Sequence, residues 1–365
     1  IDGHDINELI SVIGNLKDFE GPQFLHVITK KGAGLDPAEA DRIGFHAIGK
    51  IKPLGSPIDK TGPKYQDVFG DWIIDMALQN ENLRAITPAM REGSGLVEFS
   101  KDYPDKFFDV AIAEQHAVTL AAGMACEGKK PIVAIYSTFL QRAYDQLIHD
   151  VALQNLDVLF AIDRAGLVGE DGPTHSGNYD ITFLRCIPNM IIAVPADENE
   201  ARLLLTTCFE HTGPAAVRYP RGGGINSLIN PELLSVEIGK GREINKRKSE
   251  ILILNFGALI ASATQVADEI NATLLDMRFV KPLDSKLLSK HTKGKKLIIT
   301  IEDGAMAGGA GSAVSEWAQE NQIKSQVIIC GIPDEFIEHA SREEMIEMAG
   351  LDKKGIMQRI KDFLS

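Results

Sequence analysis

The chain has 365 residues, 44% of them hydrophobic and 24% charged, which is ordinary for a globular protein of two or three domains. Its formal net charge of −13 argues against nucleic acid as a general partner, although local arginines can still hold small anions. No apolar run approaches the ~20 residues that span a bilayer, so we expect a cytoplasmic protein without a membrane segment. The four cysteines show no CxxC spacing and lie in apolar segments, which predicts reduced core thiols: Cys126, Cys186, Cys208 and Cys330.

Residues 1–55 predict the remnant of a domain followed by a linker. A helix is expected over 5–17, and the apolar run 21–29 predicts a buried strand. A lone strand needs a sheet to join, and the sequence begins with neither Met nor a signal peptide. We therefore expect the C-terminal portion of a longer polypeptide. The segment 51–64 is rich in Pro, Gly and Lys and is typical of a linker.

Residues 56–239 predict an α/β domain, because near-continuous apolar strands alternate with helices. This alternation is typical of a doubly wound parallel sheet covered on both faces. The expected strands lie at 130–136, 157–163, 190–194 and 215–219, and the expected helices at 140–153, 181–185 and 198–210. Residues 240–365 predict a second α/β domain, with strands at 251–256, 272–277, 295–301 and 326–329.

Polar side chains follow several of these strands. Tyr136 ends one strand, Asp163 and Arg164 end the next along the chain, and Arg221 follows the last strand of the first domain. Ligands of such sheets bind beyond the carboxyl ends of the strands. We therefore expect these side chains to converge on one rim and form an active site there.

The segment 163–177 is a long loop that holds four glycines, one proline and five ionisable residues. Most connections in such domains run only ~2–6 residues, which favours a functional loop over a solvated Ω-loop. Arg164 is suited to grip a phosphate or carboxylate, and His175 to shuttle protons. Asp171 is suited to orient or polarise a substrate group.

Arg221 precedes three glycines, so that its guanidinium and the nearby backbone N–H groups suit an oxyanion. The alternative is a surface arginine in an ordinary turn. Arg218 lies inside the strand pattern and is interpreted as a structural ion-pair partner.

The strand-to-helix junction 136–146 leaves two interpretations open. Phe139 can stack on a cofactor ring and Tyr136 can donate a hydrogen bond to substrate, or both can be core aromatics. His46 follows a glycine-rich segment; it is either an ordinary loop residue or a group that orients a carbonyl.

Glu114 begins an otherwise apolar, small-residue helix expected over 113–125. A charge is costly in such a place unless it has a partner. The simpler alternative is a carboxylate that offsets the helix dipole. The glycine-rich segment 304–312 does not fit the GxGxxG pattern, because Val314 takes the last glycine's place, and it predicts a close strand–helix turn.

Taken together, Glu114, the 136–146 junction, the 163–177 loop and Arg221 make the chain resemble the 1-deoxy-D-xylulose-5-phosphate synthases, a family of transketolase-like thiamine diphosphate enzymes. The resemblance continues through segments 255–257, 276–284 and 308–312. It implies a pyrimidine-binding transketolase-like domain at 56–239, a transketolase C-terminal domain at 240–365, and a homodimer.

The resemblance also implies a transferase reaction, the condensation of pyruvate with D-glyceraldehyde 3-phosphate with loss of CO₂. The product would supply isoprenoid, thiamine and pyridoxal synthesis. In this family Glu114 would share a proton with N1′ of thiamine diphosphate, Phe139 would stack on the aminopyrimidine, and Arg142 would lie nearby. The groups that would hold the phosphate-bearing substrate are Tyr136, Arg164 and Arg221. Those that would handle substrate oxygens and protons are His46, Asp171 and His175.

Two departures from the family pattern matter. The GDG…N motif that holds the diphosphate and Mg²⁺ is absent, so no metal ligand is expected in this chain. We expect the chain to be inactive without an N-terminal fragment or the remainder of the same polypeptide. Leu35 also stands where the family usually has a Tyr that contacts the cofactor.

Three alternatives remain at this stage. One is another family member such as a transketolase. Another is the β subunit of a 2-oxo acid dehydrogenase, which would have a partner α chain, although such a subunit should begin near the pyrimidine-binding domain. The last is a non-catalytic binding module, which predicts that Glu114→Ala leaves function intact.

Overall fold

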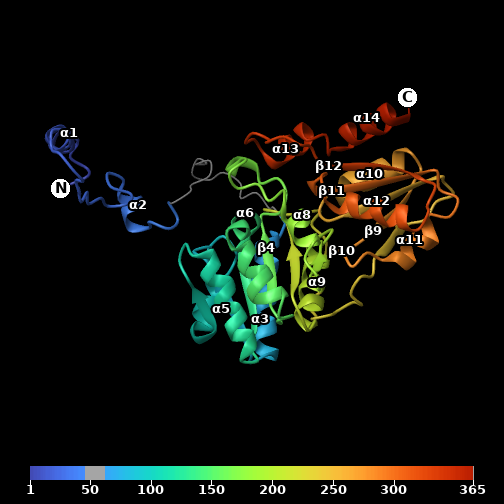
Figure 1. Ribbon diagram of the computed structural model, residues 1–365, viewed down its shortest axis with the longest axis horizontal. Coiled ribbons are helices and arrows are strands. Elements are labelled where there is room, and N and C mark those ends of the chain that lie inside the picture. Colours follow the sequence, from blue (N-terminus) through green and yellow to red (C-terminus); the bar gives the residue numbers. More distant parts are fainter. Residues whose placement is uncertain (46–61, 365) are drawn as a thin grey trace. The chain divides into compact units, whose positions relative to one another are not determined.

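The computed structural model describes residues 1–45 and 62–364 and divides into two compact units, Ile1–Lys60 and Thr61–Ser365 (Figure 1). In the first unit, α1 (Ile6–Leu16) begins after Asp5, whose side chain accepts hydrogen bonds from the N–H groups of Asn7 and Glu8. This helix was predicted. It is followed by α2 (Asp36–Ala40).

The buried strand predicted at 21–29 is wrong. Phe24 is 91% exposed, and Ile28 forms only an isolated bridge with Asp2. A strand needs neighbouring strands to satisfy its backbone groups. Within residues 1–45 no sheet is present for this run to join, so it stays extended.

The second unit contains a seven-stranded sheet in the order β10-β5-β6-β4-β3-β1-β2. Its strands are β1 (Leu83–Thr87), β2 (Phe107–Asp109), β3 (Lys130–Tyr136), β4 (Leu159–Asp163), β5 (Ile191–Ala193), β6 (Ala215–Arg218) and β10 (Phe279–Lys281). All neighbours are parallel except β10, which runs antiparallel to β5 at the edge. The register pairs Tyr136 with Asp163 and Ile162 with Arg218, so the carboxyl ends of β3, β4 and β6 are level.

Helices cover both faces of this sheet (Figure 1). Along β4, Phe160 and Ile162 pack into one buried cluster, while Leu159 and Ala161 pack into another, as the alternation of a strand requires. The helices are α3 (Tyr65–Gln79), α4 (Val97–Asp102), α5 (Glu114–Cys126), α8 (Asp180–Arg185) and α9 (Glu198–Glu210). The doubly wound α/β arrangement predicted from the sequence is therefore confirmed.

The single helix predicted at 140–153 is broken into short turns. It is replaced by α6 (Ser137–Leu140), the 3₁₀ turn η2 (Gln141–Ala143), α7 (Tyr144–Gln146) and a π-helical turn, η3 (Leu147–Ala152). The break falls at Ala143, whose backbone leaves the helical region with φ −116° and ψ 20°. Such π turns are frequent at functional sites, and this one follows Phe139 and Arg142 in the chain.

The second sheet has the order β12-β11-β8-β9-β7. Its strands are β7 (Arg242–Asn245), β8 (Ile251–Phe256), β9 (Thr273–Asp276), β11 (Leu297–Ala305) and β12 (Gln326–Ile332), and only the edge strand β7 is antiparallel. Its helices are α10 (Ile260–Glu269), α11 (Ser285–His291), α12 (Ala310–Glu320), α13 (Arg342–Met348) and α14 (Lys353–Leu364). Each sheet is thus parallel apart from one antiparallel edge strand, which the sequence pattern did not predict.

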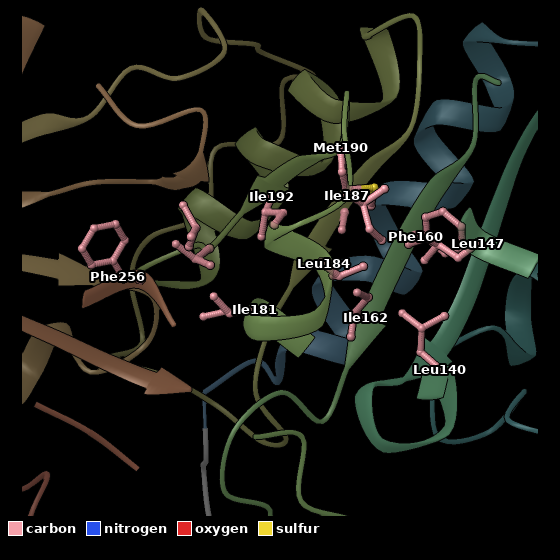
Figure 2. Close-up of a cluster of buried hydrophobic side chains, with 14 of the residues drawn as sticks. Leu140, Leu147, Phe160, Ile162, Ile181, Leu184, Ile187, Met190, Ile192 and Phe256 are labelled. Carbon is pink, nitrogen blue, oxygen red and sulfur yellow. The ribbon is translucent and has the colours of Figure 1, made fainter. Parts of the chain in front are cut away.

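One apolar cluster joins the two sheets. It runs from Leu140 and Leu147 through Ile181 to Phe256 of β8, and Figure 2 shows part of it. Strand β10 also reaches from the second half of the chain into the first sheet. The two halves of this unit therefore share a core.

The junction between the two sheets also contains buried charged side chains. The guanidinium of Arg218, 2% exposed, donates from Nε to Asp180 at 2.9 Å and from Nη1 to Asp303. The structural role predicted for Arg218 is therefore confirmed. Cys208 and Cys330 are buried as predicted. The prediction of core thiols is wrong for Cys126 and Cys186, which are exposed at the C-terminal ends of α5 and α8. No helix in the described ranges is long and apolar enough to cross a membrane.

Candidate active site

The candidate site lies at the carboxyl edge of the seven-stranded sheet, where β3 ends at Tyr136 and β4 at Asp163. Arg164, the next residue, has a left-handed backbone with φ +57°. Such a conformation is strained for a residue with a side chain and occurs mainly where function or packing requires it. Here it turns the guanidinium of Arg164 over the ring of Tyr136, 4.2 Å from the ring centroid.

Arg164 is 8% exposed, and several hydrogen bonds hold its side chain. Its Nη1 donates to the carbonyl of Gly93 at 2.5 Å, to Oε1 of Gln66 at 3.3 Å, and to the carboxylate of Asp163. Burial raises the pKa of Asp163 to about 6, although the charge of Arg164 opposes that shift. A Cβ at Gly93 would lie 1.7 Å from Oη of Tyr136, so a larger residue there would have to displace the Tyr136 side chain.

A series of contacts between aromatic and charged side chains connects Tyr136 to Glu114. The rings of Tyr136 and Phe139 are stacked with centroids 6.0 Å apart, and His175 meets Phe139 edge-on at 5.4 Å. The guanidinium of Arg142 lies 4.8 Å from the centroid of the Phe139 ring. Its Nη1 donates to Oε1 of Glu114 at 2.7 Å. Both aromatic residues are partly buried and pack against the apolar core, so both interpretations made from the sequence stay open.

Glu114 is the first residue of α5 and only 2% exposed. Its one ion pair, with Arg142, uses Oε1, and no other described residue bonds to Oε2. A buried carboxylate with one oxygen left over fits a ligand that carries a hydrogen-bond donor. The ring of Phe139, which the guanidinium of Arg142 also contacts, can pack against a planar group. This pair therefore matches the needs of an aminopyrimidine.

Arg221 belongs to a second group of predicted residues. Its Nη1 donates to the carbonyl of Val168 at 2.9 Å and lies 3.0 Å from Asp171 and 3.1 Å from Glu170. Arg221 and Arg164 line one cavity of about 450 Å³. The rim convergence expected from the sequence is therefore present.

The structure thus places eight of the nine predicted site residues at this edge, and the ninth, His46, lies outside the described residues. Asp171 is exposed and His175 half-buried, with Nδ1 of His175 2.9 Å from the hydroxyl of Thr174. The sequence reasoning missed Gln66, Gly93 and Arg342. Gly93 had a signal, because a glycine-rich stretch follows β1, whereas Arg342 had none.

In the two described ranges, no group of three or more His, Cys, Asp or Glu side chains could hold a metal ion.

Two transketolase family models match the chain. The transketolase pyrimidine binding domain matches residues 61–224, and the transketolase C-terminal domain matches residues 239–356. The chain belongs to the transketolase family. The boundaries predicted from the sequence, 56–239 and 240–365, stay predictions.

Curated relatives of the chain are named 1-deoxy-D-xylulose-5-phosphate synthase. The relative from Stutzerimonas stutzeri (strain A1501) is 57% identical over 368 residues, which cover 100% of this chain and 58% of the relative. The relative from Pseudomonas aeruginosa (strain UCBPP-PA14) is 58% identical over 365 residues, with the same coverage. The relative from Marinomonas sp. (strain MWYL1) is 59% identical over 363 residues, covering 99% of the chain and 58% of the relative. The chain thus spans less than three fifths of their length.

Solved structures agree with the fold. A split-gene transketolase, described as an inactive beta4 tetramer, matches with a TM-score of 0.73 at 25% identity. The match covers 82% of this chain and 98% of the transketolase chain. The transketolase of Campylobacter jejuni subsp. jejuni NCTC 11168 matches with a TM-score of 0.67 at 17% identity. This match covers 84% of this chain and 48% of the Campylobacter jejuni chain. The second likeness shows the fold alone.

Proposed function

We propose that this chain is part of a 1-deoxy-D-xylulose-5-phosphate synthase, a thiamine diphosphate-dependent transferase. It would condense pyruvate with D-glyceraldehyde 3-phosphate, releasing CO₂ and giving 1-deoxy-D-xylulose 5-phosphate. Relatives of that name, 57% to 59% identical along the chain, support this reaction over that of a transketolase or an oxo acid dehydrogenase. The observation that carries the proposal is the buried carboxylate of Glu114, which keeps one oxygen for a ligand.

Glu114, Phe139 and Arg142 are the residues proposed to hold the aminopyrimidine. The cofactor would supply the nucleophilic carbon and the electron sink for decarboxylation. Arg142 holds Oε1 of Glu114 and leaves Oε2 to share a proton with a ring nitrogen. Phe139 offers an aromatic surface for the ring itself.

Arg164 and Arg221 are proposed to bind the phosphate of the aldehyde substrate. Guanidinium groups match phosphate geometry with paired hydrogen bonds, and such charge-assisted bonds are among the stronger ones. The cavity that both arginines line can position the aldehyde relative to the reacting carbon. Tyr136, close to Arg164, is proposed to contact the same substrate.

Asp171 and His175 are proposed to orient substrate oxygens and move protons, and His46 is retained as a third candidate. We also propose Mg²⁺ for the diphosphate, a homodimeric assembly, and completion of the site by a diphosphate-binding part of the polypeptide. None of these is needed to interpret the contacts described above.

The reaction is tested with the full-length protein, thiamine diphosphate, Mg²⁺, pyruvate and D-glyceraldehyde 3-phosphate. We expect 1-deoxy-D-xylulose 5-phosphate in the mass spectrum, and its loss with Glu114→Gln. Parallel reactions offer lipoamide as acyl acceptor, or xylulose 5-phosphate and ribose 5-phosphate as transketolase substrates. Turnover only in one of these parallel reactions would overturn the proposal, and full activity of the Glu114 variant would remove its cofactor role.

A further inference from the structure

The cavity at the candidate site is lined by arginines from three separate parts of the chain. Arg164 follows β4, Arg221 follows β6, and Arg342 is the first residue of α13 in the second half of the chain. Lys64 adds a fourth basic group, against the acidic Glu170 and Glu343. The lining is therefore electropositive, in a chain whose net charge is −13.

The three arginines differ in how many partners they have. Arg164 is bonded to Asp163, Gln66 and Gly93, and Arg221 is paired with two carboxylates and a carbonyl, as described above. Arg342 forms no ion pair with any residue in the described ranges, and its Nε is buried without a hydrogen-bond partner. The Nε of the nine-tenths buried Arg164 is also unpartnered. Buried donors without partners are costly, and Arg342, with no described ion-pair partner for its charge, can offer its terminal nitrogens to a ligand in this cavity.

Packing fixes the place of Arg342 beside the 163–177 loop. Met345 of α13 is fully buried, and its Sδ accepts a hydrogen bond from the N–H of Gly169 at 3.2 Å. Gly169 has φ +75°, and a Cβ there would lie 3.4 Å from the backbone nitrogen of Arg342. At the next glycine of the loop, Gly172, a Cβ would meet the side chain of His339 at 2.8 Å. This close approach keeps Arg342 at the cavity.

We propose that Arg342 is a third binding residue for the phosphate of the aldehyde substrate. This inference rests on the function proposed above and extends it to the C-terminal half of the chain. A phosphate monoester has three free oxygens and about two negative charges, enough for three guanidinium groups. Arg342 would thus favour a phosphorylated aldehyde over the same aldehyde without phosphate.

The test compares Arg342→Met with wild type in the full-length protein. Losing one charge-assisted hydrogen bond should raise the KM for D-glyceraldehyde 3-phosphate about tenfold or more. The KM for pyruvate, the KM for unphosphorylated D-glyceraldehyde and kcat should change less than about twofold, because none of them depends on the phosphate. The Arg342→Lys variant should recover part of the lost affinity for D-glyceraldehyde 3-phosphate. Thermal melting shows whether each variant is folded.

Arg359→Met is the matched control, because Arg359 is an exposed residue of α14 that does not line the cavity. It should leave every KM unchanged. An unchanged KM for D-glyceraldehyde 3-phosphate in a folded Arg342→Met protein would overturn the inference. An equal rise for D-glyceraldehyde would also overturn it, because the effect would then not concern phosphate.

Calorimetric titration with inorganic phosphate separates this inference from the proposed reaction. Phosphate should bind the wild type and the Arg359 variant equally and the Arg342 variant at least about tenfold more weakly. Absence of product from the wild type would refute the proposed reaction, while this titration would still decide the role of Arg342. Equal phosphate binding by all three proteins would refute that role.

Discussion

Two arginines at the end of β6, three residues apart, serve different regions of the molecule. The side chain of Arg218 is 1% exposed and shares its donors between Asp180 and Asp303 in the junction of the two sheets. The side chain of Arg221 is 34% exposed and lines a cavity with two other arginines. The same residue type therefore closes a structural cluster in one region and lines the cavity proposed to bind substrate in the other.

Carboxylates show the same contrast. Asp180 and Asp303 both face Arg218, while Glu302 accepts the N–H groups of Ala310 and Gly311 at 2.7 Å each. Within the described ranges, Glu114 has only Arg142 as partner. Burial alone does not distinguish a structural carboxylate from a functional one, and among the described residues Asp303 also bonds through one oxygen only, so the effect of substitution has to decide. Four predictions test this distinction, beginning with the largest expected effect.

Glu114→Gln should lower kcat by roughly 10²- to 10⁴-fold, the usual range for a lost proton-transfer group. The amide keeps the shape and can still accept from Arg142, but it cannot share a proton with a ring nitrogen. The free energy of unfolding from urea titration should change by less than about 1 kcal/mol. A kcat within threefold of wild type would place Glu114 among the structural carboxylates.

Arg218→Met should destabilise the protein by about 3–5 kcal/mol, because Asp180 and Asp303 would be left as buried charges without a cation. Urea titration measures this loss. The matched control is Arg221→Met, for which a change of less than about 1 kcal/mol is expected because its ion pairs are exposed. Similar losses of stability in both variants would show that the two arginines do not differ in their structural role.

Arg221→Met should raise the KM for D-glyceraldehyde 3-phosphate by about tenfold or more, the effect of one lost charge-assisted hydrogen bond. The KM for pyruvate should stay unchanged. Steady-state kinetics at varied aldehyde concentration provides the measurement. A rise in the KM for pyruvate instead would assign Arg221 to the other substrate.

Glu302 predicts an effect that is spread over several pH units, a dependence of stability on pH. Burial raises its pKa from 4.5 to about 8, so the folded protein keeps a proton that the unfolded chain releases above about pH 4.5. The contribution to stability is thus full below about pH 4.5 and is lost as pH rises toward 8, at most about 1.4 kcal/mol per pH unit. Glu302→Gln should flatten the decline of the urea midpoint between pH 5 and 8. An unchanged slope would show that Glu302 is ionised in the folded protein.

Much of the site could be predicted from the sequence, because strand ends in a parallel sheet share one edge. That rule was enough to group Tyr136, Arg164 and Arg221, and the apolar surroundings of Glu114 pointed to its burial. Arg342 could not be predicted, because its place depends on packing between Met345 and Gly169, 176 residues apart in the chain.

The failures in the fold have a similar cause. Strand β10 joins the first sheet through an antiparallel pairing with β5 that no local pattern encodes. The helix expected at 140–153 breaks at Ala143, where periodicity gave no warning. Conversely, the run at 21–29 has a strand-like pattern but no sheet within residues 1–45 to pair with. Local periodicity predicts an element only where tertiary packing also favours it.

The central claim, that the buried carboxylate of Glu114 activates thiamine diphosphate, is tested most directly by deuterium exchange. Full-length wild-type and Glu114→Gln proteins, each saturated with thiamine diphosphate and Mg²⁺, are mixed with D₂O, and exchange of the C2 proton of the bound cofactor is followed by NMR after acid quench. We predict exchange at least about a hundredfold slower in the variant, without any substrate present. Equal exchange rates in the two proteins would contradict the claim.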